Sequence, residues 1–318
     1  MSSTHTRRRF LGSTLVGAAA LAASSRVFSA EEKRKRRYDI GVAGISFSQM
    51  VGGDFKKLLG IFPVIREELE LSFFDLTTAI MTPPSLAMVG QLQAASQKSG
   101  VAVRNILVGG EGNLGAKEKA ERERAVRYHR KWIDVAADLG ASAIRCNWGG
   151  EERGMLGKPE VERDFVVRSG DAFRALIDYG KAQKIDIMVE NHGGASSQPR
   201  LVVALMKEVN DRHFGTLPDF GNFPPEIDRY EGIDAMMPWA KTISAKCYDF
   251  GPDGNELTID FARMMEIVCD KHGYSGYVHI EYEGPRYAAE RGVAPLDKLE
   301  GVRAAKRLLE RLREVEGA

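Results

Sequence analysis

Six ionisable side chains each lie at or near the C-terminal end of a short apolar run. They are Arg145, Glu190, Asp219, Lys246, His279 and Glu281. Three of the six are carboxylates, and carboxylates held close together must share protons, pair with cationic groups or bind a metal ion. Three carboxylates around one hard divalent ion, such as Mg²⁺ or Mn²⁺, are a common arrangement because these ions prefer oxygen ligands. The residue types therefore indicate a candidate metal centre, provided that the fold brings them together.

The apolar runs that carry these residues predict eight buried strands, over residues 39–45, 71–76, 101–108, 142–147, 185–190, 214–219, 242–247 and 277–281. Amphipathic segments between them predict helices over residues 120–139, 173–183, 261–269 and 296–315. Alternating strands and helices predict a parallel sheet. About eight such units in about 280 residues fit a single-domain α/β fold, the (β/α)8 TIM barrel.

An open, doubly wound sheet is the alternative architecture. The first predicted strand is not followed by the G-x-G-x-x-G pattern that typically binds dinucleotides in such sheets. The sequence also contains no G-x-x-x-x-G-K-[ST] phosphate loop. The glycine-rich segment 108–113, which follows the third strand, is either a mobile active-site loop or an ordinary turn.

Side chains alternate between the two faces of a strand, so the pattern predicts which residues point into the barrel. In the last strand Val278 and Ile280 suit the helix-facing side, which places His279 and Glu281 inside. The same argument gives the inward residues of the preceding strands as Arg145, Asn147, Met188, Glu190, Leu217, Asp219, Ser244 and Lys246. Active sites of such barrels lie at the C-terminal ends of the strands, so we expect the charged residues to converge there.

Ordinary salt bridges at the barrel rim, Glu190 with Arg145 and Asp219 with Lys246, are the alternative explanation for single members of the set. The placement of the whole set at predicted strand ends favours a functional site. Among the other histidines, His129 is expected on the solvent side of its helix, whose predicted apolar stripe includes Tyr128.

Composition and charge exclude several classes of protein. The first 30 residues contain four arginines and no acid, and the remaining 288 residues carry a formal charge of −3, so a dedicated nucleic-acid binder is disfavoured. Three scattered cysteines, Cys146, Cys247 and Cys269, do not form a disulfide framework or a C-x-x-C zinc site. They are best interpreted as small buried side chains.

The N-terminus predicts an export signal rather than a stable membrane anchor. The segment Thr6-Arg7-Arg8-Arg9-Phe10-Leu11 precedes an apolar run, residues 12–23, that is shorter than the roughly 20 residues that a bilayer requires. The adjacent arginines resemble a twin-arginine signal, which implies recognition by the twin-arginine export machinery and a periplasmic or secreted location. We therefore expect residues 1–30 to be the signal, residues 31–37 a charged leader and residues 38–318 the barrel.

Four segments resemble the sugar phosphate isomerase/epimerase family, the xylose isomerase-like TIM-barrel group. They are Ile187–Gly194 (IMVENHGG), Leu217–Phe223 (LPDFGNF), Ser244–Lys246 (SAK) and His279–Gly284 (HIEYEG). The resemblance extends from Tyr38 to the C-terminus and, with the signal, is similar to an exported branch of the family. It implies a small sugar as the substrate and an isomerase or epimerase activity.

The resemblance also implies one divalent ion held by Glu190, Asp219 and Glu281, most often Mn²⁺ or Mg²⁺, with Zn²⁺ or Co²⁺ as further candidates. Family members usually supply a histidine from an H-x-K segment on the seventh strand, and here Ser244 stands at that position. Because a hydroxyl is a poorer ligand than imidazole, His192 or a water could complete the shell, or the metal could be lost.

The implied chemistry is proton transfer next to a carbonyl, with an enediolate intermediate and with Glu190 and Glu281 as base and acid. Lys246 is expected to polarise a substrate oxygen. The residues expected to bind the substrate are Asn147, Trp148, which would stack on a sugar ring, Asn191, His192 and Arg286, which could meet a phosphate. Because an exported enzyme seldom meets sugar phosphates, a non-phosphorylated or oxidised sugar is the more natural substrate.

Three rival functions follow from the same residues. A lyase or dehydratase would expel a leaving group from the same enediolate. A non-catalytic carbohydrate-binding protein would explain a metal site weakened at Ser244. A DNA-repair nuclease resembling endonuclease IV would need several histidine ligands for a multi-zinc cluster, whereas the chain has only six histidines, one of them (His5) in the signal.

Overall fold

The computed structural model describes residues 38–148 and 154–314, so the predicted export signal and leader lie outside the described residues. The eight predicted strands are all present: β1 (Asp39–Ala43), β2 (Phe73–Thr77), β3 (Ala102–Val108), β4 (Ala143–Cys146), β5 (Asp186–Glu190), β6 (Phe214–Leu217), β7 (Thr242–Cys247) and β8 (Tyr277–Tyr282). Neighbouring strands pair in parallel in the order β6-β5-β4-β3-β2-β1-β8-β7. Two isolated parallel bridges, Thr216–Ala240 and Asp219–Ser244, join β6 to β7 and close the ring. The predicted (β/α)8 TIM barrel is confirmed.

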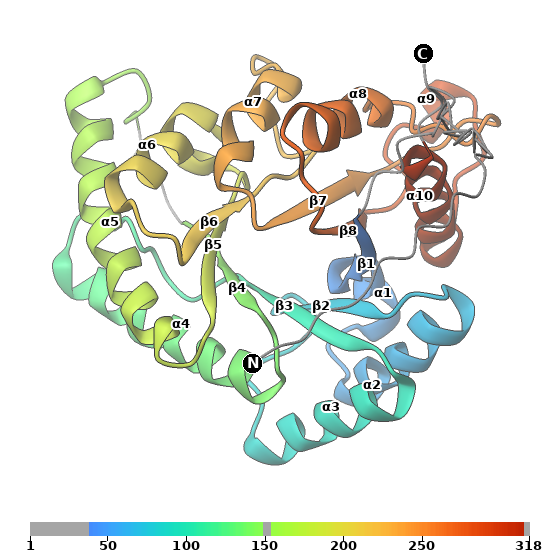
Figure 1. Ribbon diagram of the computed structural model, residues 1–318, viewed down its shortest axis with the longest axis horizontal. Helices are drawn as coiled ribbons and strands as arrows, with labels where there is room; N and C mark the ends of the chain where they lie inside the picture. Colours follow the sequence, from blue (N-terminus) through green and yellow to red (C-terminus); the bar gives the residue numbers. More distant parts are fainter. Residues whose placement is uncertain (1–37, 149–153, 315–318) are drawn as a thin grey trace, which may run out of the picture.

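Helices surround this ring of strands (Figure 1). They are α1 (Ser48–Val51), α2 (Phe55–Pro63), α3 (Leu86–Ser99), α4 (Lys119–Asp138), α5 (Pro159–Lys181), α6 (Pro199–Val209), α7 (Arg229–Met236), α8 (Phe261–Met265), α9 (Ala288–Arg291) and α10 (Lys298–Arg313). The helix predicted over residues 173–183 is the second half of α5, which begins with Pro159 in its first turn. The helix predicted over residues 261–269 is α8 continued by a π-helical segment, Glu266–Lys271. Within the described residues, no helix combines the length and the apolar character that crossing a membrane requires.

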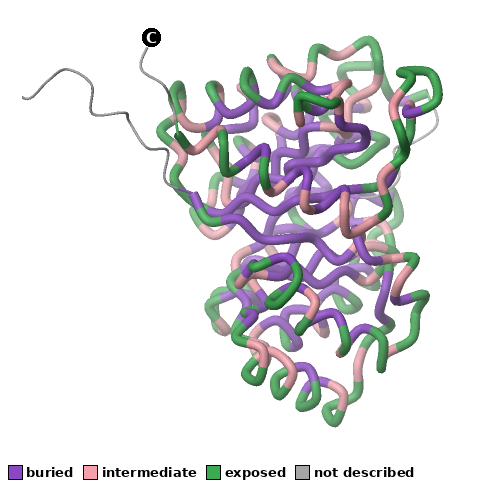
Figure 2. Tube along the Cα trace, turned by 90° about the vertical axis from the view of Figure 1, so that its right-hand side faces the viewer, coloured by how far each residue is buried: buried purple, intermediate pink, exposed green. Residues whose placement is uncertain are grey.

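The apolar core has two parts. The larger part fills the space between the strands and the helices, so the strands are buried on both faces while the outer helix faces are exposed (Figure 2). A small second cluster lies inside the ring and consists of Ala43, Leu107, Ala143, Met188 and Leu217. Buried polar residues occupy the rest of the interior of the ring. Those at the C-terminal ends of the strands lie where the active sites of such barrels are found.

The expected orientation of α4 is wrong by one residue. His129 is only 1% exposed and its Nδ1 atom lies 2.8 Å from the carbonyl oxygen of Ala125, whereas Tyr128 is 46% exposed. Neighbouring residues on a helix differ by about 100° in direction, so Ala125, His129, Trp132 and Ala136 form the buried stripe in place of a stripe through Tyr128. Burial lowers the pKa of His129 below its ordinary value, so the imidazole is a neutral part of the core.

Replacing Gly301 tests how closely α10 approaches the barrel. An added Cβ atom at Gly301 would lie 2.1 Å from the ring of the buried Tyr282. We expect Gly301→Ala to lower the free energy of unfolding by about 1–3 kcal/mol because the core is overpacked. Gly90→Ala in α3, where an added Cβ meets nothing within 4 Å, is the matched control and should raise stability by up to about 1 kcal/mol. Urea unfolding of both variants measures the difference, and equal stabilities would contradict this packing.

Candidate active site and metal centre

Three carboxylates from three different strand ends meet at the mouth of the barrel. Glu190 ends β5, Asp219 follows β6 by two residues and Glu281 lies in β8. One oxygen from each residue lies within 4.8 Å of the others, and all three side chains are buried. The predicted convergence of these three acids is therefore confirmed.

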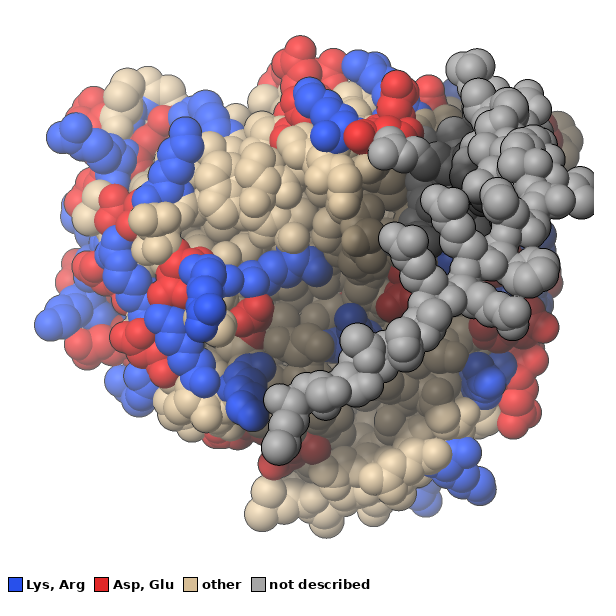
Figure 3. Space-filling view, viewed as in Figure 1, with Lys and Arg blue, Asp and Glu red and all other residues tan. Residues whose placement is uncertain are grey.

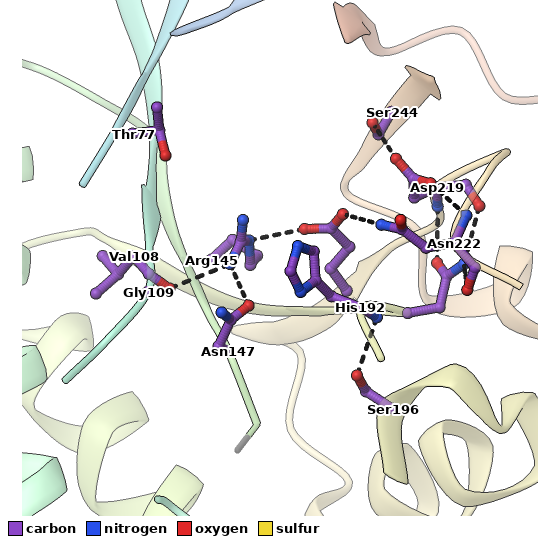
Figure 4. Close-up of polar contacts among 12 residues, drawn as sticks. Thr77, Val108, Gly109, Arg145, Asn147, His192, Ser196, Asp219, Asn222 and Ser244 are labelled. Atoms are coloured by element: carbon purple, nitrogen blue, oxygen red, sulfur yellow. Dashed lines mark hydrogen bonds and ion pairs between the residues drawn. The ribbon is translucent and has the colours of Figure 1, made fainter. Parts of the chain in front are cut away.

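Glu190 is held from both sides. Its Oε2 atom lies 2.8 Å from Nε of Arg145, and its Oε1 atom accepts a hydrogen bond from Nδ2 of Asn222 at 2.9 Å (Figure 4). Arg145 also donates to the carbonyl oxygen of Val108 and to Oδ1 of Asn147. Burial, with a contribution from the charge of Glu281, raises the pKa of Glu190 above its ordinary value although Arg145 opposes this shift. The predicted pairing of Glu190 with Arg145 is present inside the site rather than at its rim.

Asp219 is held mainly by hydrogen bonds. Its Oδ1 atom accepts the backbone N–H groups of Gly221 and Asn222 at 2.9 and 2.8 Å, and its Oδ2 atom accepts the hydroxyl of Ser244 at 2.5 Å. Burial raises the pKa of Asp219 to about 7, and the charges of Glu281 and Glu190 add to this shift while Lys246 opposes it. Without a bound cation, burial and the neighbouring carboxylates therefore leave Asp219 only partly ionised near neutral pH.

Lys246 pairs with Glu281 and not, as the rim salt bridge would require, with Asp219. Its Nζ atom lies 2.7 Å from Oε1 of Glu281, 3.0 Å from Oε1 of Glu283 and 2.9 Å from Oδ1 of Asn222. An ammonium group has three N–H donors, and these three acceptors engage all of them. Burial opposes ionisation, but the surrounding carboxylates raise the pKa of Lys246 well above its ordinary value. Lys246 therefore orients Glu281 and has no N–H left to offer to a ligand in this structure.

A buried pair lies next to Glu281. Nδ1 of His279 is 2.7 Å from Oδ2 of Asp75, and Nε2 of His279 is 3.8 Å from Oε2 of Glu281. Burial disfavours the imidazolium, but the two carboxylates outweigh this effect and raise the pKa of His279 to about 10. Burial likewise disfavours an ionised Glu281, but Lys246 and His279 hold its pKa well below the ordinary value. Glu190 and Glu281 thus have pKa values shifted in opposite directions.

A cavity of about 340 Å³ opens beside the triad, and its lining includes Thr77, Arg145, Asn147, His192, Glu281 and Glu283. The outer helices carry acidic and basic side chains in an interspersed pattern (Figure 3). Burial, with the nearby charges of Arg145 and Lys246, lowers the pKa of His192 below its ordinary value, so a neutral imidazole faces the cavity. Gly109, at the start of the glycine-rich segment, also lines it, while Glu111 ties this segment to Trp132 of α4 at 2.7 Å.

The structure brings only two of the five expected substrate contacts, Asn147 and His192, to the cavity. Asn191 is fully buried and uses its side-chain amide on the backbone of Asp219, donating at 2.9 Å and accepting at 2.8 Å. Its role is therefore to fix the loop that carries Asp219. Arg286 is exposed at the surface, with its guanidinium above the rings of Tyr248 and Tyr287.

The predicted stacking of a sugar on Trp148 is wrong in this structure. Trp148 is 1% exposed, and its ring stacks on Phe165 with 5.1 Å between the ring centroids. The alternation of side chains explains this, because Arg145 and Asn147 point into the barrel and Trp148 must then point toward the helices.

Sequence reasoning missed Asn222 as a functional residue. Its backbone N–H binds Asp219 (Figure 4). Its side chain links Glu190 to Lys246, so Asn222 contacts two members of the triad and the partner of the third. The sequence marks this loop only by a glycine before Asn222, and the structure gives its reason: a Cβ atom at Gly221 would lie 2.7 Å from the side chain of Lys246. Glu283, two residues after Glu281, was missed in the same way.

Comparisons with known proteins agree with this fold. A sequence model of the family described as xylose isomerase-like TIM barrel matches residues 67–314. No curated protein matches the chain at a significant level. Similar solved structures include an L-ribulose 3-epimerase (16% identity, 86% of this chain and 94% of that chain covered, TM-score 0.69) and the D-allulose 3-epimerase of Methylomonas sp. (16%, 87% and 98%, 0.67). The 3-keto-D-glucoside 4-epimerase of E. coli is also similar (16%, 86% and 100%, 0.65).

The raised pKa of Asp219 predicts how stability depends on pH when no metal is present. Its folded-state value of about 7 lies above the ordinary value of 3.8, so the folded state binds this proton more tightly than the unfolded state does. The resulting stabilisation is complete below about pH 4 and is lost as the pH rises to about 7. We expect Asp219→Asn, measured by urea unfolding in EDTA, to gain on the order of 1–3 kcal/mol relative to wild type between pH 5 and pH 8.

Asp211→Asn is the control for this experiment. Burial opposes the shift, but Lys181 lowers the pKa of Asp211, so this variant should instead lose stability relative to wild type above about pH 4. A difference between Asp219→Asn and wild type that does not change with pH would contradict the pKa assigned to Asp219.

Proposed function

The chain belongs to the xylose isomerase-like TIM barrel family, and from this premise we propose that it is a sugar isomerase or epimerase. Its reaction is proton transfer at a carbon next to a carbonyl, through an enediolate. The observation that supports this proposal is the pair Glu190 and Glu281, two buried carboxylates of one triad whose surroundings shift their pKa values in opposite directions. Such a separation suits one group to act as an acid and the other as a base.

Glu281 is the better base, because it lines the cavity and Lys246 and His279 keep it ionised. Glu190 is the better acid, because its raised pKa favours the protonated form. Both oxygens of Glu190 are engaged by Arg145 and Asn222, so these two residues control the direction in which its carboxyl group points.

The donor set fits a divalent ion. Glu190, Asp219 and Glu281 offer three buried carboxylate oxygens within 4.8 Å, and the charges of Glu281 and Glu190 add to the pKa increase that burial causes at Asp219, an effect that a bound cation would oppose. When bound, such an ion supplies electrostatic stabilisation of the negative charge that develops on the substrate oxygens. We propose Mn²⁺ or Mg²⁺ for this position, with Zn²⁺ and Co²⁺ as alternatives.

The proposed substrate is a non-phosphorylated or oxidised sugar. A cavity of about 340 Å³ lies at the small end of the usual range for ligand sites, which suits a monosaccharide. Arg145 and Lys246, the cations beside the triad, are both engaged with carboxylates, so neither is free to bind a phosphate. Asn147, His192 and Thr77 offer neutral hydrogen-bonding groups that suit hydroxyls.

We also propose that residues 1–30 direct export by the twin-arginine route to the periplasm or the exterior. The pair Arg7–Arg8 before Phe10 and Leu11 supports this proposal. We expect cell fractionation to find the double variant Arg7→Lys/Arg8→Lys in the cytoplasm and the wild-type chain outside the cytoplasm. Equal distribution of the two forms would contradict export by this route.

Replacing the two carboxylates tests the activity. With Mn²⁺ and a panel of ketoses and keto-sugars, we expect Glu281→Gln and Glu190→Gln each to lower kcat roughly 10²–10⁴-fold, since each removes one proton-transfer group. Glu70→Gln, an exposed residue that pairs with Lys306, is the matched control and should keep full activity. Full turnover by both active-site variants would end the two-carboxylate mechanism.

Products formed in D₂O separate the rival functions. An epimerase or isomerase incorporates solvent deuterium at carbon without losing a substituent, whereas a lyase releases one. A carbohydrate-binding protein would show sugar binding in calorimetry that EDTA does not change, with no turnover.

A further inference from the structure

The buried pair Asp75–His279 does not itself transfer a proton in the proposed reaction, although the charge of His279 helps to keep Glu281 ionised. Both side chains are fully buried, and they come from β2 and β8, which lie on either side of β1. Nδ1 of His279 lies 2.7 Å from the Asp75 carboxylate, while Nε2 has no hydrogen-bond partner among the described residues. Buried polar atoms are normally bonded, so an imidazole nitrogen left without a partner requires an explanation.

The unpartnered Nε2 atom lies beside the acidic triad. Oε2 of Glu281 lies 3.8 Å from it. Backbone register places Asp219, Ser244 and His279 in one row across the barrel wall, because Asp219 pairs with Ser244 and Ser244 pairs with His279. Ser244 is the small middle member of this row, and its hydroxyl reaches both Oδ2 of Asp219 and Oε2 of Glu281, at 2.5 and 3.3 Å.

The opposite side of the imidazole is fixed. Asp75 accepts hydrogen bonds from both the backbone N–H and the side-chain Nδ2 of Asn105, at 3.1 and 3.0 Å. The strand register between β2 and β3 shifts at Phe74 and Asp75, as expected where a side chain takes a backbone donor. Asn105 therefore fixes the Asp75 carboxylate independently of His279. Because this carboxylate binds Nδ1, the other ring nitrogen, Nε2, faces the triad.

We propose that His279 is the nitrogen ligand of the divalent ion bound by Glu190, Asp219 and Glu281, and that Asp75 is its positioning residue. This inference rests on the metal site of the proposed function. Metal-binding histidines commonly donate their second ring N–H to a carboxylate, and the Asp75–His279 pair has this form. The ligating imidazole is neutral, so the Nε2 proton leaves to solvent when the ion binds.

The assignment defines the class of ion. Three carboxylate oxygens alone suit Mg²⁺ or Mn²⁺, whereas an added imidazole raises the affinity for later transition metals such as Co²⁺ or Zn²⁺ above that for Mn²⁺. The assignment also explains how the site could have an imidazole ligand when the seventh strand carries Ser244. His279 is paired with Ser244 on the neighbouring strand, so it can supply the ligand from there.

The test is Mn²⁺ binding by the purified full chain after treatment with EDTA, measured by calorimetry and by pulsed electron paramagnetic resonance. We expect a nitrogen coupling to Mn²⁺ in the wild type that changes when histidine is labelled with ¹⁵N. In His279→Gln the coupling should disappear and the affinity for Mn²⁺ should fall at least tenfold. Asp75→Asn should keep the fold and weaken binding about 10–100-fold.

His272→Gln is the matched control, since His272 pairs with Asp234 on the outer helices, and it should bind Mn²⁺ as the wild type does. His192→Gln tests the other histidine near the triad. A coupling lost in His192→Gln and kept in His279→Gln would overturn the proposal, as would Mn²⁺ bound with no nitrogen coupling. If His279→Gln does not fold, the labelled wild type, His192→Gln and Asp75→Asn still decide the question.

The measurement separates this inference from the proposed function. Mn²⁺ bound through His279 in a chain that turns over no sugar would support the inference and contradict the isomerase proposal. Sugar turnover with Mn²⁺ that lacks a nitrogen coupling would support the isomerase and contradict the inference.

Discussion

The cost of holding three carboxylates together, away from water, is the constraint on which the rest of the site depends. Each acid has partners from a different source: Arg145 and an amide for Glu190, backbone N–H groups and a hydroxyl for Asp219, and Lys246 for Glu281. Asn222 joins these separate arrangements into one network. Because these partners belong to the strands and strand-end loops of the barrel, they hold the carboxylates in position.

The same network makes the three acids chemically different although they lie within 4.8 Å. Burial raises the pKa of Glu190 and Asp219, while Lys246 and His279 keep Glu281 ionised. A reaction that takes a proton from one face of a carbon and returns one elsewhere needs such unequal groups. The buried histidine and its aspartate lie behind Glu281 and extend this polar network into the interior of the barrel.

Much of this arrangement could be predicted from the sequence, because the barrel obeys two simple periodicities. The strand positions and the inward direction of Glu190, Lys246 and His279 follow from apolar runs and alternation. The partner of Lys246 could not be predicted in this way, since it depends on strand register: Lys246 pairs with Glu281, whereas Asp219 lies one layer lower beside Ser244.

Two other errors have similar physical causes. His129 was misplaced because a helical stripe read from sequence is uncertain by one residue in its phase, and one residue is enough to exchange a buried for an exposed side chain. Asn222 lies in a loop, where no periodicity applies and only the close approach of Gly221 to Lys246 marks the position.

The seam between β6 and β7 is the place where the ring of strands is most thinly joined. Two isolated bridges hold it, and one of them is Asp219–Ser244, inside the acidic centre. Backbone hydrogen bonds from Ser244 to Pro218 and from Phe220 to Ser244, at 2.9 and 3.1 Å, secure the same point. A ligand bound at this centre would therefore also stabilise the contact between β6 and β7. Its binding would slow the exchange of the amide hydrogens along this seam.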